Sequence, residues 1–139
     1  MMNYNQELVL NGEAVIEMFN HLGVSIAVFD CDMNMIYMNE RAKWFYRHVF
    51  GAENILGKDV KSCHEDVHIR NIKHLLEQFE KGKPLNFFHA DPPMIEGGHL
   101  TVLHYPYIIE GKVKGIMEIN IESSLSEGGR GEYERKFSE

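Results

Sequence analysis

The chain has 139 residues, enough for one domain with a substantial core but too few for two. Its 14 basic and 21 acidic residues give a net charge of −7, which argues against a nucleic-acid-binding surface. No apolar run approaches the roughly 20 residues that span a bilayer, and the N-terminus lacks a signal-peptide pattern, so no membrane partner is expected. Two cysteines, Cys31 and Cys63, do not make a disulfide framework, and a cytoplasmic location is expected.

The first half of the chain predicts a helix, a hairpin and a second helix after a poorly ordered lead-in over residues 1–11. Apolar residues at helical spacing predict a helix over 12–22, which Gly23 ends. Strand patterns at 24–28 and 35–39 flank the turn residues 30–34 and predict a hairpin. A short helix is expected over 40–50, followed by a glycine-bracketed loop over 51–62.

The second half predicts a long helix and three strands. The helix opens within the segment Cys63–His74, runs to about Lys81, and is stopped by the glycine and proline of residues 81–84. Strands are expected over 85–91, 99–109 and 113–122, with Pro106 indicating an edge position or a bulge. In the last strand Met117, Ile119 and Ile121 alternate with Glu118, Asn120 and Glu122. Residues 125–139 have the composition of a flexible polar tail.

This order predicts an α+β fold with a five-stranded antiparallel sheet and helices packed on one face. Three segments then resemble parts of a PAS domain over residues 12–124: "SIAVFDCDMNMIYMNERA", "NILGKDV" and "KVKGIMEINIE". Asn39 and Ala42 fall on the usual Asn and Ala of the PAS opening motif. The segment "GKDVKSCHEDVHIRNIKHLLEQFEKGK" is similar to a bacterial and archaeal PAS subgroup with a Cys-His pair and a second histidine before the long helix. One departure is Glu122-Ser123-Ser124, where many PAS domains have Asp-x-Thr before an output helix.

A competing motif lies in the same segment, because "HEDVH" is a literal H-E-x-x-H, the signature of zinc peptidases. A small zinc metallohydrolase would use His64 and His68 as ligands, Glu65 as general base and His74 as third ligand. However, the apolar stripe of His68, Ile72, Leu75, Leu76 and Phe79 passes over Asn71 without a break, which indicates one continuous helix. Such a helix carries His74 to the solvated face, so the signature is interpreted as accidental.

The PAS resemblance implies a ligand pocket between the long helix and the sheet, lined by Ile72 and Leu76. In PAS haem sensors a histidine of this region binds the iron, which makes His68 the candidate ligand here. His64 is the second choice and Cys63 a weaker one, with Met117 on the last strand as a distal ligand and Met35 or Met38 as alternatives. The competing interpretation is that His68 is an ordinary core or capping residue. The facing of His89, His99 and His104 stays open.

The sequence therefore predicts a cytoplasmic, non-enzymatic PAS sensory domain that binds a small molecule or haem. By resemblance it would pair as a homodimer and signal to a partner protein, either a kinase or a transcription regulator. The alternatives are the zinc metallohydrolase and a dimerisation module without a ligand.

Overall fold

A computed structural model of the chain describes residues 11–58, 66–90 and 98–124. Within these ranges the expected helices and strands are all present, with ends that differ by a few residues from the sequence prediction. The expected lead-in and tail fall almost entirely outside the described residues. In chain order the elements are α1 (Gly12–Asn20), β1 (Ser25–Asp30), β2 (Met35–Met38), α2 (Glu40–Phe50), α3 (Asp66–Glu80), β3 (Asn86–Ala90), β4 (Gly98–Ile109) and β5 (Lys112–Ser124).

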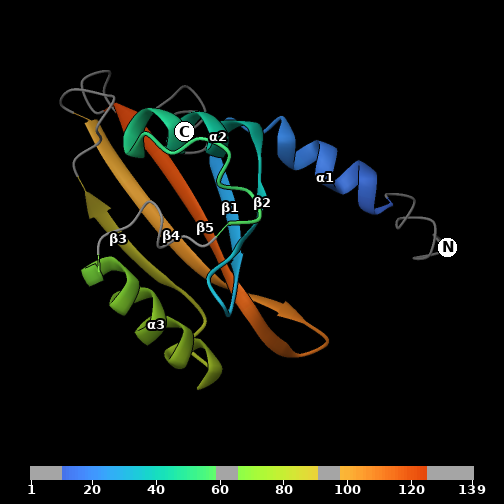
Figure 1. Cartoon of the computed structure of the whole chain (residues 1–139), viewed down its shortest axis with the longest axis vertical. Coiled ribbons are helices and arrows are strands. Elements are labelled where there is room, and N and C mark those ends of the chain that lie inside the picture. Colours follow the sequence, from blue (N-terminus) through green and yellow to red (C-terminus); the bar gives the residue numbers. More distant parts are fainter. Residues whose placement is uncertain (1–10, 59–65, 91–97, 125–139) are drawn as a thin grey trace, which may run out of the picture.

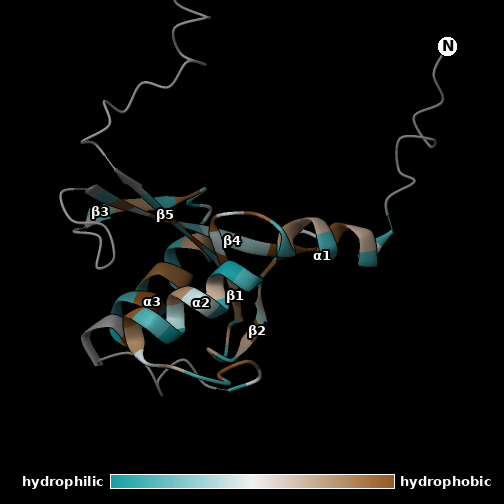
Figure 2. Cartoon of the chain, turned by 90° about the horizontal axis from the view of Figure 1, so that it is seen from above, coloured by the Kyte–Doolittle hydropathy of each residue, from teal (hydrophilic) through white to brown (hydrophobic). Residues whose placement is uncertain are grey.

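The strands form one antiparallel sheet in the order β2-β1-β5-β4-β3. Helix α2 contacts β1 and β2, and α3 contacts β5, so both helices cover the same face of the sheet (Figure 1). Seen from above, the sheet and this helix pair make two layers (Figure 2). Helix α1 extends away from the sheet and buries none of its residues. The five-stranded α+β architecture is confirmed, and no helix of the described ranges is long and apolar enough to cross a membrane.

The core lies between the sheet and the α2–α3 pair. Helix α3 contributes Ile69, Ile72, Leu75, Leu76 and Phe79. The last four confirm their part of the predicted apolar stripe, whereas the side chain of His68, its first member, lies outside the described residues. Because side chains alternate along a strand, β5 turns Ile116 toward the helices and Met117 away from them. We call the helix-covered side of the sheet the inner face and the opposite side the outer face.

Asn39 joins the α1–β1 connection to the start of α2. Its fully buried side chain caps α2 by accepting a hydrogen bond from the Ala42 amide at 2.8 Å, and it accepts a second from the Ile26 amide at 3.0 Å. Its Nδ2 donates to the carbonyl oxygens of Phe19 and Val24 at 2.9 and 2.8 Å. One amide therefore fixes where α2 begins relative to β1, which gives the PAS-like Asn a physical role.

Two local features of the sheet bear on the sequence prediction. Strand β3 pairs only with residues 100–104 of β4, so Pro106 lies beyond the end of that neighbour, and the register shifts between Tyr107 and Ile108. Pro106 therefore has no partner in β3 and lies close to a register shift in the pairing of β4 with β5. Both features accommodate a residue that has no amide hydrogen to donate. At Gly115 a Cβ atom would overlap the carbonyl oxygen of Phe29, so β1 and β5 can approach each other there only because the residue is glycine.

Candidate functional site

Four polar side chains meet at the inner face. Glu118 and Asn120 project from β5, His104 faces Glu118 from the paired position of β4, and Tyr46 reaches them from α2. All four residues are less than a tenth exposed. We call Tyr46, His104, Glu118 and Asn120 the buried polar cluster.

The carboxylate of Glu118 is the centre of this cluster. Its Oε1 accepts hydrogen bonds from the Tyr46 hydroxyl at 2.7 Å and from Asn120 Nδ2 at 2.9 Å, and its Oε2 lies 3.1 Å from His104 Nε2. Burial by itself would raise the pKa of Glu118. The hydrogen bond and positive charge of His104, with the hydrogen bonds from Asn120 and Tyr46, outweigh burial and lower this pKa from 4.5 to about 2. Glu118 is therefore an ionised, buried acceptor at neutral pH.

This contact determines what His104 can offer a ligand. A carboxylate only accepts, so His104 Nε2 carries the hydrogen of that bond. The other ring nitrogen, Nδ1, is buried and has no hydrogen-bond partner. Phe88 of β3 lies against the imidazole, with ring centroids 6.0 Å apart and an interplanar angle of 29°. A buried polar atom without a partner is costly, and Nδ1 is such an atom.

A cavity of about 270 Å³ lies between α3 and strands β3 and β4, and His104 is part of its wall. Lys83 does not line the cavity, but its Nζ donates to two lining residues, to Gln78 Oε1 at 3.3 Å and to Asn86 Oδ1 at 3.4 Å. The cavity is small and is lined by both apolar and polar side chains, as small-molecule sites commonly are. Its lining residues are Asn71, Ile72, His74, Leu75, Gln78, Asn86, Phe88 and His104.

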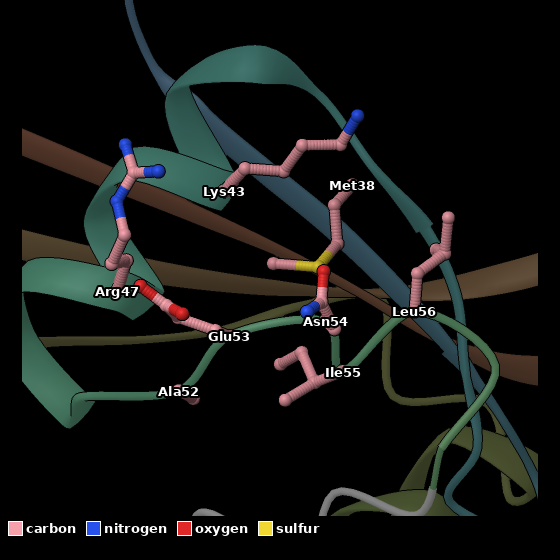
Figure 3. A pocket seen from close by; sticks show the side chains of 8 residues that line it. All are labelled: Met38, Lys43, Arg47, Ala52, Glu53, Asn54, Ile55 and Leu56. Atoms are coloured by element: carbon pink, nitrogen blue, oxygen red, sulfur yellow. The ribbon is translucent and has the colours of Figure 1, made fainter.

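A second cavity, of about 380 Å³, lies between α2 and the loop that follows it (Figure 3). Lys43 and Arg47 extend from α2 along one side, while the buried side chains of Met38 and Ile55 provide apolar surface. Its charged side chains are exposed to solvent. The smaller cavity is the better candidate because His104 of the buried polar cluster forms part of its wall.

The structure brings some of the sequence-predicted site residues to the inner face. Ile72 and Leu76 are buried on α3, and Ile72 lines the smaller cavity. Met35 and Met38 are buried on β2. His68 belongs to the first turn of α3, but its side chain, like Cys63 and His64 as a whole, lies outside the described residues.

Met117 does not join this site. It alternates with Ile116 and Glu118, which face the helices, and it pairs with Val28 and Tyr105 on the outer face. The structure therefore places Met117 on the side of the sheet opposite α3, away from the position of a distal ligand.

The strand histidines, left open by the sequence, divide between the two faces. Only His104 of the three points inward, whereas His89 and His99 are exposed on the outer face with ring centroids 6.2 Å apart. Among residues 11–58, 66–90 and 98–124, no three His, Cys, Asp or Glu side chains are grouped to hold a metal ion. Helix α3 is also unbroken at Asn71, so positions 68 and 74 point about 120° apart around its axis.

Sequence reasoning missed Glu118, Asn120 and Tyr46. The alternation of apolar and polar residues along β5 was visible in the sequence, but an apolar residue of this strand, Met117, was assigned to the pocket. The available signal was the pair of ionisable residues at 104 and 118 on neighbouring strands of a predicted hairpin.

Solved structures with a similar fold include a PAS domain, a sensor histidine kinase and a phage VqmA complex. The PAS domain of Bordetella pertussis BvgS has a TM-score of 0.59 at 21% identity, covering 98% of this chain and 96% of that one. A sensory box sensor histidine kinase from Vibrio cholerae has a TM-score of 0.55 at 13% identity, covering 88% and 98%. A phage VqmA–DPO complex has a TM-score of 0.58 at 19% identity, covering 91% of this chain and 57% of that one.

No protein-family model matches the sequence, and no curated protein is significantly similar to it. The family resemblance therefore rests on the quoted motifs and on the three-dimensional fold. The strand order, the helices on the inner face and the similar structures agree, and they show that this chain has the fold of a PAS domain.

Proposed function

We propose that this chain is a cytoplasmic, non-enzymatic sensory domain that binds a small organic molecule in the cavity between α3 and strands β3 and β4. The observation that carries the proposal is the cavity itself, whose wall combines the apolar side chains of Ile72, Leu75 and Phe88 with His104 of the buried polar cluster. Sites for small molecules commonly combine an apolar wall with a few polar groups. The structurally similar phage VqmA was solved as a complex with DPO, which supports ligand binding by a domain of this fold.

The buried polar cluster gives this site a route to the rest of the domain. His104 contacts Glu118 on β5, and Glu118 contacts Tyr46 on α2. A ligand that reorients the imidazole would alter both hydrogen bonds, and so the position of α2 relative to β5. In this proposal a partner protein, either a kinase or a transcription regulator, senses that change.

A fragment screen by ¹H–¹⁵N NMR tests the proposal. We expect some small polar fragments to shift the amide resonances of α3, β3 and β4, and His104→Phe to abolish these shifts while keeping a ring in place. His89→Phe is the matched control, because His89 is exposed on the outer face. A screen without any binder, or binding that survives in His104→Phe, would contradict the proposal.

Homodimerisation is the second part of the proposed function. Helix α1 exposes Ile16 and Met18, which are 50% and 56% exposed, and the outer face exposes Phe87, which is 61% exposed. Two copies that covered these apolar surfaces would gain roughly 25 cal/mol for each Å² removed from water. Light scattering coupled to gel filtration should therefore give a dimer mass, and Ile16→Asp should give a monomer mass.

Leu56→Asp is the control for this experiment, because Leu56 is also 50% exposed but lies beside the second cavity. It should leave the dimer intact. A monomeric parent protein, or a dimer that resists both substitutions, would count against the α1 interface.

Haem binding through His68 stays a prediction, and the described residues favour a smaller ligand. Asn71, Gln78 and Asn86 present amide groups to the cavity, whereas a haem would need a broad apolar slot. If haem binds, protein from haem-supplemented cells should show a Soret band that His68→Ala removes. Metal analysis of the same sample tests the zinc alternative, two of whose residues, His64 and Glu65, lie outside the described residues.

A further inference from the structure

Two histidines lie side by side on the outer face of the sheet. His89 of β3 pairs directly with Thr101 of β4, and His99 stands two residues before Thr101 on the same strand. This diagonal relation brings both side chains together on one face. Both are exposed, and their ring centroids are 6.2 Å apart with an interplanar angle of 49°, so the rings are tilted and not stacked.

This spacing suits two ligands of one metal ion. With metal–nitrogen bonds of about 2.0–2.1 Å, two imidazoles on a tetrahedral ion have centroids about 5 Å apart, and two on opposite sides of an ion about 6 Å apart. The two rings of this pair therefore need to approach by about 1 Å to reach the tetrahedral arrangement, which exposed side chains can do by small rotations. Imidazole is a common ligand of zinc, copper and nickel ions.

Thr101 holds one of the two rings as a metal ligand would be held. Its hydroxyl oxygen lies 3.1 Å from His89 Nδ1, so this contact occupies Nδ1 and leaves Nε2 for a metal ion. Nε2 binds a metal through its lone pair when the hydrogen is on Nδ1, and the hydroxyl can accept that hydrogen. Metal-binding histidines are almost always oriented in this way through their second ring nitrogen.

One chain supplies too few ligands to complete the site. Among the residues that the structure describes, no third His, Cys, Asp or Glu is grouped with His89 and His99, whereas structural zinc sites have four ligands. A second copy related by twofold symmetry presents the same two histidines. It would also cover apolar neighbours of the pair, because Phe87 contacts His89 edge-on and the exposed Ile121 is the β5 partner of Thr101.

We propose that His89 and His99 form one half of a site for a divalent transition-metal ion, and that the same residues of a second copy complete it. Each chain has a net charge of −7, so two copies repel each other, and a divalent cation between them offsets part of that repulsion. The ion therefore strengthens the pairing of two outer faces. This inference rests on the homodimerisation proposed above and makes that dimer dependent on metal.

Zinc chloride is the probe, added to protein that has first been treated with EDTA and freed of it. Analytical ultracentrifugation gives the Kd of the dimer, which we expect zinc to lower at least roughly tenfold, since the ion binds the dimer better than the monomer. Calorimetry should give about one zinc ion for two chains. Copper(II), which is paramagnetic, should at low ratios broaden the amide resonances around residues 89 and 99 before the others.

Three histidine variants make the test specific to the site. His89→Ala and His99→Ala should each abolish the effect of zinc on the dimer. His48→Ala should leave it unchanged, because His48 is also exposed but lies on α2, on the opposite side of the sheet. A ¹H–¹⁵N spectrum of each variant without metal checks that it is folded.

The outcomes separate the metal site from the dimer itself. A dimer that forms equally well with EDTA and with zinc, or an effect of zinc that survives in both His89→Ala and His99→Ala, would overturn the metal inference and leave the homodimer standing. One zinc ion per chain with an unchanged dimer Kd would also overturn it, because a single copy would then complete the site. A protein that stays monomeric with and without zinc would overturn both proposals.

Discussion

Replacing Glu118 with glutamine tests the buried polar cluster, because the two side chains have nearly the same shape and only Glu118 carries a charge. Three donors point at the carboxylate, from Tyr46, Asn120 and His104. Glutamine offers one accepting oxygen and an NH₂ group that itself donates. At least one of the three donors would therefore lose its acceptor, and His104 would lose its counter-charge.

The magnitude follows from the pKa of Glu118, which is about 2 in the folded protein against 4.5 for an unperturbed glutamate. This difference corresponds to about 3 kcal/mol of the free energy of unfolding. Because the folded-state pKa is the lower one, the contribution is fully present above about pH 5 and is lost as the pH falls from about 4.5 to 2. Glu118→Gln should thus be less stable by about 3 kcal/mol at pH 7, and this difference should shrink toward pH 2.

Urea unfolding followed by circular dichroism, repeated at several pH values, measures this difference directly. Glu77→Gln is the control, because Glu77 is exposed on α3 and its loss should cost little at any pH. The reasoning is refuted if Glu118→Gln matches the parent protein at pH 7. It is also refuted if Glu118→Gln lowers the free energy of unfolding by the same amount at pH 3 as at pH 7. The stabilisation by Glu118 would then not depend on its charge.

Three further substitutions test the packing that holds the site. Asn39→Ala removes four hydrogen bonds made by a fully buried side chain. It should lower the free energy of unfolding, measured by urea titration, by about 3 kcal/mol. A smaller loss would contradict the capping role of Asn39. Gly115→Ala places a methyl group on the backbone of β1 and should give little folded protein by NMR. Gly23→Ala, which meets no atom within 4 Å, should fold normally, so equal behaviour of the two variants would rule out the close approach. Leu76→Ala should cost about 2–5 kcal/mol by thermal unfolding, and a loss below about 1 kcal/mol would mean that α3 packs loosely on the sheet.

Local patterns were sufficient for most of the secondary structure. The stripe of Ile72, Leu75, Leu76 and Phe79 predicted α3 because a helix repeats its direction every 3.6 residues whatever it packs against. The motif at Asn39 predicted the start of α2, since a cap acts on the backbone a few residues away. Ile72 and Leu76 could be placed in the core for the same reason, and both are buried on α3, whereas their part in ligand binding stays a prediction.

The sequence by itself determined that β5 alternates between polar and apolar residues, because the pleat of a strand has a period of two. Only the tertiary structure decided which set meets the helices. Met117 was expected inside, but Glu118 and Asn120 face inward, since Tyr46 from α2 and His104 from β4 supply the hydrogen bonds that make their burial tolerable. Those partners are 72 and 14 residues away from Glu118 in the chain, so no local pattern could reveal them. The inner polar cluster is a product of long-range contacts, while the alternation that contains it is a property of the strand alone.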